Sequence, residues 1–217
     1  MRSILLLLAG CGSVQSPAAV DAPQGSNHDG AMVDAAVLPH KLVFVTSQAF
    51  TGDLGGAVGA DAKCQTLAQG ANRPGQFKAW LGNATTSAAS RIAHATVRYT
   101  LVDDTVVAND FGGLISGTLL HAIDITELGT QALGGTATDC FFGGSGVLVW
   151  TNASPDGSIS NTNPTNSCGA DWDTVGPSTA GGPFGVVGAV GSTDGSWTDL
   201  CGSAKCETTA PLYCLEQ

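Results

Sequence analysis

The chain has 217 residues and a formal net charge of −10, from 18 acidic residues against 8 Lys and Arg. This acidic balance makes nucleic acids, heparin-like polyanions and anionic lipid surfaces poor partners, because phosphate and sulfate groups are bound by basic side chains. With 30 glycines and a charged fraction of only 12%, the composition indicates a turn-rich, loop-heavy fold and not a helical bundle.

The N-terminus has the features of a short signal peptide over residues 1–10. The positively charged start, Met1-Arg2-Ser3, precedes an apolar run and two small residues. Leu8-Ala9-Gly10-Cys11 resembles the lipobox of bacterial lipoproteins, in which the cysteine is acylated and becomes the first residue of the mature chain. The resemblance implies a lipid anchor at Cys11, with membrane lipid as its partner. An ordinary secreted protein with a stray cysteine is the alternative.

Residues 11–40 are predicted to form a disordered tether, because they carry prolines, glycines and serines without sustained hydrophobic periodicity. Gly12 follows the cysteine where many inner-membrane lipoproteins have an aspartate, so we expect the outer membrane and the cell surface. No later stretch of about 18 apolar residues predicts a membrane-spanning helix. Residues 41–217 have the length of one domain.

Short apolar and β-branched runs in this domain predict strands, at residues 42–45, 77–81, 147–150 and 212–215. In the last of these, Leu212 and Cys214 are expected on one face. A hairpin is predicted over residues 99–107, with Asp103-Asp104 in its turn. Residues 118–125 are expected to be extended.

The helical spacing of Ala57, Ala60, Cys64 and Ala68 predicts a helix that ends at Gly70 and turns Cys64 inward. Shorter helical segments are expected at two further places, residues 87–93 and 110–114. Gly, Ser, Thr, Asn, Asp and Pro dominate residues 151–211, which indicates long functional loops.

Seven cysteines remain to be explained. Cys11 stands alone near the N-terminus, whereas six lie in the predicted domain: Cys64, Cys140, Cys168, Cys201, Cys206 and Cys214. An even set of six suggests three disulfides, with fifteen connectivities open to the sequence alone. Disulfides persist outside the cytosol, so we expect an exported protein.

Several motifs resemble endostatin in order along the chain. They are Cys64 on the first helix, Phe77-Lys78-Ala79-Trp80-Leu81, Val149-Trp150-Thr151-Asn152, and Leu212-Tyr213-Cys214-Leu215-Glu216. Residues 41–217 as a whole are similar to a bacterial cell-surface domain of unknown function with the C-type-lectin-like fold. The resemblance implies one disulfide-stabilised α+β domain. It also implies the nested pairs Cys64–Cys214 and Cys168–Cys206, which leaves Cys140–Cys201 as an additional bridge.

Trp197-Thr198-Asp199 resembles the Trp-Asn-Asp signature of sugar-binding C-type lectins, in which asparagine and aspartate oxygens hold calcium. Here Thr198 replaces the asparagine, and Asn163-Pro164-Thr165 only faintly matches the companion Glu-Pro-Asn triplet. The resemblance implies Asp199 and Asp194 as calcium ligands among several loop carboxylates. We favour the simpler interpretation, in which Trp197 packs in the core, Asp199 caps a turn and no cofactor is bound.

Two tryptophans, Trp80 and Trp150, are expected in the core, whereas Trp172 lies in an acidic loop and is predicted to be exposed. The candidate ligand-binding residues are Trp172, Asn163, Asp173, Trp197 and Asp199.

Catalytic and zinc motifs are absent from the sequence. His28, His40, His94 and His121 lack ligand spacing, and no nucleophile elbow or phosphate loop is present. We therefore expect a non-enzymatic module that binds a glycan or an extracellular protein through residues 151–205. The alternatives are a structural envelope lipoprotein without a small ligand and, less favoured, a secreted hydrolase.

Overall fold

The computed structural model describes residues 38–137, 146–161, 163–176 and 182–217. The predicted signal peptide, Cys11 and most of the predicted tether lie outside these ranges. His40, which the sequence assigns to the tether, is the first residue of a strand. Within the described part of the chain, no helix is long and apolar enough to cross a membrane.

The larger sheet has five strands in the order β2-β8-β1-β3-β4. Their bounds are β1 (His40–Val45), β2 (Phe77–Ala79), β3 (Arg98–Thr100), β4 (Val106–Ala108) and β8 (Tyr213–Glu216). The first and last strands are antiparallel neighbours, with Phe44 opposite Cys214, and β1 also pairs in parallel with β3. The first and last strands of the described chain are therefore neighbours at the centre of this sheet.

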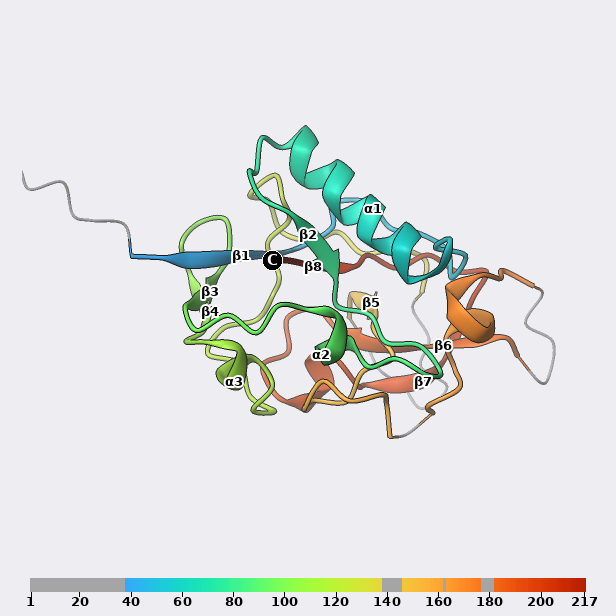
Figure 1. The fold of residues 1–217 in the computed structure, drawn as a ribbon. Coiled ribbons are helices and arrows are strands. Elements are labelled where there is room, and N and C mark those ends of the chain that lie inside the picture. The colour runs from blue at the N-terminus through green and yellow to red at the C-terminus, as the bar shows by residue number, and fades with distance from the viewer. Residues whose placement is uncertain (1–37, 138–145, 162, 177–181) are drawn as a thin grey trace, which may run out of the picture. The chain divides into compact units, whose positions relative to one another are not determined.

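The smaller sheet consists of β5 (Leu148–Trp150), β6 (Phe184–Ala189) and β7 (Cys201–Lys205), all antiparallel. A parallel bridge between Trp150 and Leu212 connects it to the segment that leads into β8. Figure 1 shows this sheet on the side of β2 and β8 away from the first helix. Strands β6 and β7 correct the prediction that residues 151–211 are all loop.

The long helix α1 (Gly56–Gly70) agrees with the predicted helix and buries Ala60, Cys64 and Ala68. The short helices α2 (Ala88–Arg91) and α3 (Phe111–Leu114) begin after the capping side chains of Ser87 and Asp110. Two further short turns are η1 (Cys168–Trp172) and η2 (Gly195–Trp197). The predicted extended segment 118–125 is irregular, with one bridge, at Ile125.

Alternation along β8 separates two apolar cores. Leu212 and Cys214 belong to one cluster, together with residues of α1. Tyr213 and Leu215 belong to the other, together with residues of β3 and β4. The prediction that Leu212 and Cys214 share a face is therefore confirmed.

Two disulfides brace this α+β structure. Cys64–Cys214 joins α1 to β8, and Cys168–Cys206 joins η1 to the end of β7. They are the two nested pairs that the endostatin-like resemblance implied. The third implied pair includes Cys140, which lies outside the described residues, and Cys201 is not a free thiol. The chain is thus a mixed α+β, disulfide-stabilised structure.

Candidate functional site

Trp172 is fully buried, which corrects its prediction as an exposed ligand-binding residue. Its indole Nε1 donates to the carbonyl oxygen of Gly82 at 2.7 Å, and its ring packs 5.4 Å from that of Trp150. Acidic neighbours in sequence suggested exposure, but the Cys168–Cys206 disulfide holds this turn against the core. Trp172 therefore has no face available for a ligand.

Trp197 is also fully buried, and its ring packs 5.3 Å from that of Trp80 and 5.6 Å from that of Tyr213. The interpretation that Trp197 belongs to the core is confirmed, and its full burial argues against the predicted ligand-binding role. Trp80 and Trp150 are buried as predicted.

Thr198 stands where sugar-binding lectins have a calcium-ligating asparagine. Its side chain forms hydrogen bonds inside the protein. Its hydroxyl accepts from Nε1 of Trp80 at 2.8 Å and donates to the carbonyl oxygen of Ala153 at 3.1 Å. Both hydrogen-bonding roles of the hydroxyl are thus used inside the protein.

The side chain of Asp199, a predicted site residue, forms hydrogen bonds with residues far from it in the sequence. Its carboxylate accepts from the Ser160 hydroxyl at 3.0 and 3.1 Å and from the Ser154 hydroxyl at 3.4 Å. The backbone N–H of Asn163 donates to the same Ser160 oxygen at 3.4 Å. The segment at Asn163 and the Asp199 side chain therefore both contact Ser160. We name Ser154, Ser160, Asn163 and Asp199 the Asp199 cluster.

A second unusual amide lies beside this cluster. The Asn152 side chain is buried, its Nδ2 donates to the carbonyl oxygen of Pro164 at 3.3 Å, and its Oδ1 has no hydrogen-bond partner among the described residues. The backbone N–H of Ser160 donates to the Asn152 carbonyl at 3.4 Å. Asn152 thus fixes the loop that carries Ser154, Ser160 and Asn163 of the Asp199 cluster.

The Asp199 carboxylate is half-buried and has no basic partner in the part of the chain that the structure describes. Burial raises its pKa, against the opposing effect of the Ser160 and Ser154 hydroxyls. Among the described residues, no Lys, Arg or His forms an ion pair with it. Within the described ranges, its hydrogen bonds come from the Ser154 and Ser160 hydroxyls, which leaves acceptor capacity for a ligand.

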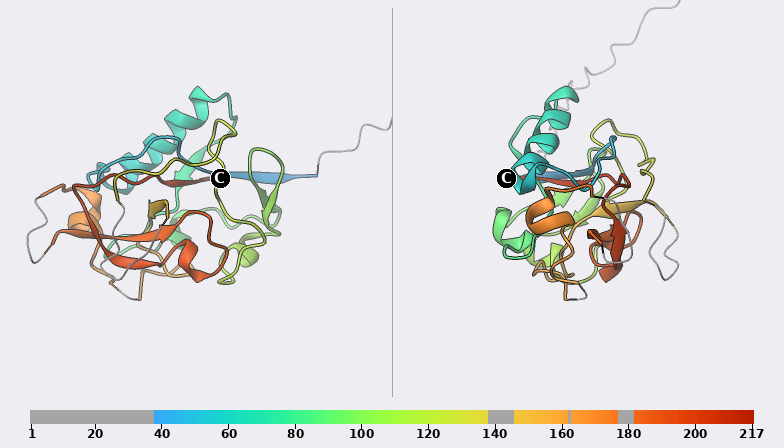
Figure 2. Two further views of the ribbon diagram at one scale, coloured as in Figure 1. Left: turned by 180° about the vertical axis from the view of Figure 1, so that it is seen from behind. Right: turned by 90° about the vertical axis from the view of Figure 1, so that its right-hand side faces the viewer.

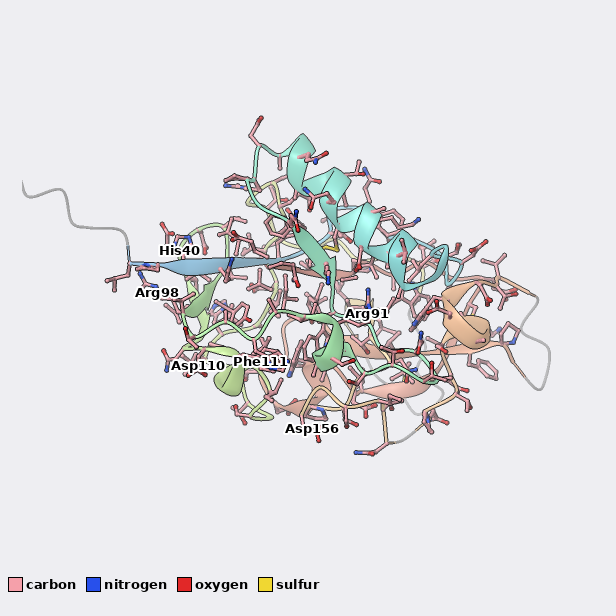
Figure 3. The ribbon with its side chains drawn as sticks, in the orientation of Figure 1. His40, Arg91, Arg98, Asp110, Phe111 and Asp156 are labelled. Atoms are coloured by element: carbon pink, nitrogen blue, oxygen red, sulfur yellow. A yellow bond between two sulfur atoms is a disulfide. The ribbon has the colours of Figure 1, made fainter. Side chains whose placement is uncertain are left out.

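Other loop aspartates have a local explanation. Hydrogen bonds from the Ser158 hydroxyl and backbone N–H lower the pKa of Asp156, and Ser196 does the same for Asp194. Asp194 thereby caps η2. Asp156 lies on the loop below α2 in Figure 3. These residues are turn caps.

Two further loop carboxylates, Asp171 and Asp173, lie in the η1 turn and at its end. Asp171 accepts from Nδ2 of Asn83 at 2.8 Å, and Asp173 is exposed in the turn that follows η1. Across the ranges that the structure describes, no three His, Cys, Asp or Glu side chains lie close enough together to hold a metal ion. Calcium at Asp199 would therefore depend on hydroxyl and carbonyl oxygens.

The described histidines lie apart. The His94 ring stacks on Phe111 with centroids 3.9 Å apart, and Nδ1 of His121 is 3.9 Å from Asp124. His40 lies at the start of β1, near Arg98 (Figure 3). His28 lies outside the described residues.

No family model matches the chain, and no curated protein is significantly similar to it. A function is therefore argued from the chemistry of its sites.

Proposed function

We propose that this protein is a non-enzymatic binding module of the bacterial cell envelope. An acyl group on Cys11 anchors it, and the surface around the Asp199 cluster recognises a glycan. The observation that carries the proposal is the half-buried Asp199 carboxylate, which is held by two serine hydroxyls and has no basic partner among the described residues.

The C-type-lectin-like fold is part of this proposal. Two features support it: the implied nested disulfides Cys64–Cys214 and Cys168–Cys206, and the pairing of β1 with β8 at the centre of the sheet. The two lectin-like motifs also meet at Ser160.

The chemistry of the Asp199 cluster suits sugar hydroxyls. A sugar O–H can donate to the Asp199 carboxylate, and hydrogen bonds with an ionised partner are stronger than neutral ones. The Ser160 hydroxyl, whose oxygen accepts only one long hydrogen bond among the described residues, can accept from the same sugar through its second lone pair. The desolvation that raises the Asp199 pKa strengthens such contacts, because the local dielectric is low.

A glycan array tests the proposal. The chain is applied with millimolar calcium and with chelator, beside Asp199→Asn and the matched control Asp156→Asn. We expect wild type and Asp156→Asn to bind the same glycans, and Asp199→Asn to lose at least about tenfold in affinity, the loss of one charge-assisted hydrogen bond. A blank array in both conditions, with a folded chain, would favour a structural envelope protein.

The anchor has its own test. Intact mass of the membrane-extracted protein should show a cleaved chain that begins at Cys11 and carries acyl groups. Cys11→Ser should move the protein to the soluble fraction, because each buried methylene contributes about 0.8 kcal/mol to membrane binding. An unmodified Cys11 in the native protein would remove the anchor.

A further inference from the structure

An open groove of about 440 Å³ lies between α1 and the segment that leads from β1 into it. Its apolar walls include Phe50, Ala62 and Leu67, the polar Gln48 and Thr66 also line it, and Lys63 is its one charged lining residue. We name this the α1 groove. The segment before α1 runs alongside the helix (Figure 2). The groove is separate from the Asp199 cluster, with which it shares no lining residue.

The first wall of the α1 groove is firmly held. Phe50 and Ala210 exchange two backbone hydrogen bonds of 2.9 Å, and Nε1 of Trp150 donates to the Phe50 carbonyl at 2.8 Å. The backbone N–H of Leu54 donates to the carbonyl oxygen of Trp172 at 2.9 Å.

The opposite wall is α1, which the Cys64–Cys214 disulfide fixes one residue after Lys63. A groove with two braced walls is preorganised, so a ligand has little ordering cost to overcome.

Lys63 has ammonium N–H donors that no described residue uses. Its ammonium group lies 5.4 Å from the centroid of the Phe50 ring and donates to the carbonyl oxygen of Leu54 at 3.2 Å. An ammonium group has three donors, of which this contact uses one. Over the described ranges no carboxylate forms an ion pair with Lys63, although the chain carries 18 acidic residues. By contrast, Lys41 and Arg91 both have acidic partners.

We propose that the α1 groove binds an aliphatic carboxylate of the fatty-acid type. The hydrocarbon chain packs on Phe50, Ala62 and Leu67, while the carboxylate accepts from the free donors of Lys63. Pockets of a few hundred Å³ with apolar walls and few polar groups are typical of small-ligand sites. A charge-assisted hydrogen bond between the Lys63 ammonium and the carboxylate gives the site its preference for negative charge.

The test is a titration of the isotope-labelled full chain, carrying Cys11→Ser so that no acyl group is attached. Octanoate should produce saturable amide chemical-shift changes at Gly55, Gly59 and Ala62. Octylammonium should bind at least about tenfold more weakly, because it lacks the one charged hydrogen bond that octanoate forms. Lys63→Met keeps the aliphatic stem and should weaken octanoate binding by a similar factor. Lys63→Arg and the exposed control Lys205→Met should retain it.

Three results would overturn the proposal: no saturable shift with octanoate, equal affinity for octanoate and octylammonium, or unchanged octanoate affinity in folded Lys63→Met. If Lys63→Met does not fold, the octanoate and octylammonium titrations of the parent chain decide. Asp199→Asn should leave octanoate binding unchanged. The glycan proposal and the α1 groove proposal can therefore be rejected independently of each other.

Discussion

Arg91 donates to Oδ1 of Asp61 at 2.7 Å, and this ion pair ties α2 to α1. The same guanidinium donates to the carbonyl oxygens of Ala79 at 3.2 Å, Leu81 at 2.6 Å and Ala57 at 3.1 Å. Only 11% of the Arg91 side chain and 24% of the Asp61 side chain are exposed. Figure 3 shows Arg91 between these elements. One side chain thus holds together α1, β2 and α2.

Arg91→Met should therefore be strongly destabilising. It leaves the Asp61 carboxylate, which still accepts from the Ala79 backbone N–H at 2.9 Å, without its basic partner, and it removes the guanidinium donors of three carbonyl oxygens. This predicts a loss of about 3 kcal/mol in the free energy of unfolding. Urea denaturation followed by tryptophan fluorescence measures it. The control is Lys41→Met, whose Nζ is 3.8 Å from Glu216 in a more exposed pair and which should cost less than about 1 kcal/mol. Equal losses in the two variants would contradict the role assigned to Arg91.

The two disulfides should contribute unequally to the free energy of unfolding. Cys64–Cys214 spans a sequence separation of 150 and Cys168–Cys206 one of 38. The chain-entropy model then gives about 5 and about 4 kcal/mol respectively. Replacing each pair by alanines and measuring the free energy of unfolding should show the larger loss for Cys64–Cys214. The reverse order would mean that the disulfide beside the η1 turn acts mainly through the folded state.

Regular apolar patterns allowed much of the fold to be predicted. The strands predicted at residues 42–45, 147–150 and 212–215 are short, uninterrupted apolar runs. Helix α1 followed from small apolar residues at helical spacing, and its burial of Cys64 set up the disulfide to β8. The nested pairing came from the endostatin-like resemblance, because six cysteines alone leave fifteen connectivities open.

The remaining features depend on contacts that composition does not show. Strands β6 and β7 lie in a glycine-rich region, and the adjacent Val186 and Val187 were the main local signal of β6. The Asp199 cluster joins Asp199 to serines 39 and 45 positions earlier, a relationship without local periodicity. Trp172 was assigned to the surface from its acidic neighbours, but tertiary packing decides its burial.

Gly185 shows how closely the smaller sheet packs. A Cβ at this position would lie 2.7 Å from the Trp150 ring and 3.0 Å from the Cys168 sulfur. Gly185→Ala should therefore lower the free energy of unfolding by about 1–3 kcal/mol, since the buried ring must move. Gly70→Ala is the control, because a Cβ there has no neighbour within 4 Å. Chemical denaturation of both variants checks this, and an undisturbed Gly185→Ala would mean that the Trp150 ring can shift freely.

Trp172→Ala should be among the most damaging substitutions. It empties a buried indole site and leaves the Gly82 carbonyl without its donor, which together predict a loss of about 3–5 kcal/mol. Trp172→Phe restores most of the packing but not the hydrogen bond, so its loss should be about 1–3 kcal/mol. Near-ultraviolet circular dichroism and urea denaturation measure both. A folded, equally stable Trp172→Ala would return this residue to the list of ligand-binding candidates.

Asp199 should make the protein less stable as the pH rises. Burial raises its folded-state pKa above the ordinary value of 3.8, so the folded chain binds more protons than the unfolded one. The stability that this group contributes is therefore fully present below 3.8 and is lost as the pH rises through the folded-state pKa. Asp156, whose pKa is lowered by Ser158, has the opposite sign, with stability lost as the pH falls.

Asp199→Asn should accordingly raise the melting temperature at neutral pH relative to wild type and lose this advantage in acid, whereas Asp156→Asn should show the reverse trend. Thermal melts of the three proteins across acidic and neutral pH measure both. If Asp199→Asn increases stability but abolishes glycan binding, the Asp199 carboxylate serves function and not folding, because functional sites commonly lower stability. If Asp199→Asn instead destabilises the protein at neutral pH, the carboxylate is a structural cap, and the binding role proposed for the Asp199 cluster loses its support.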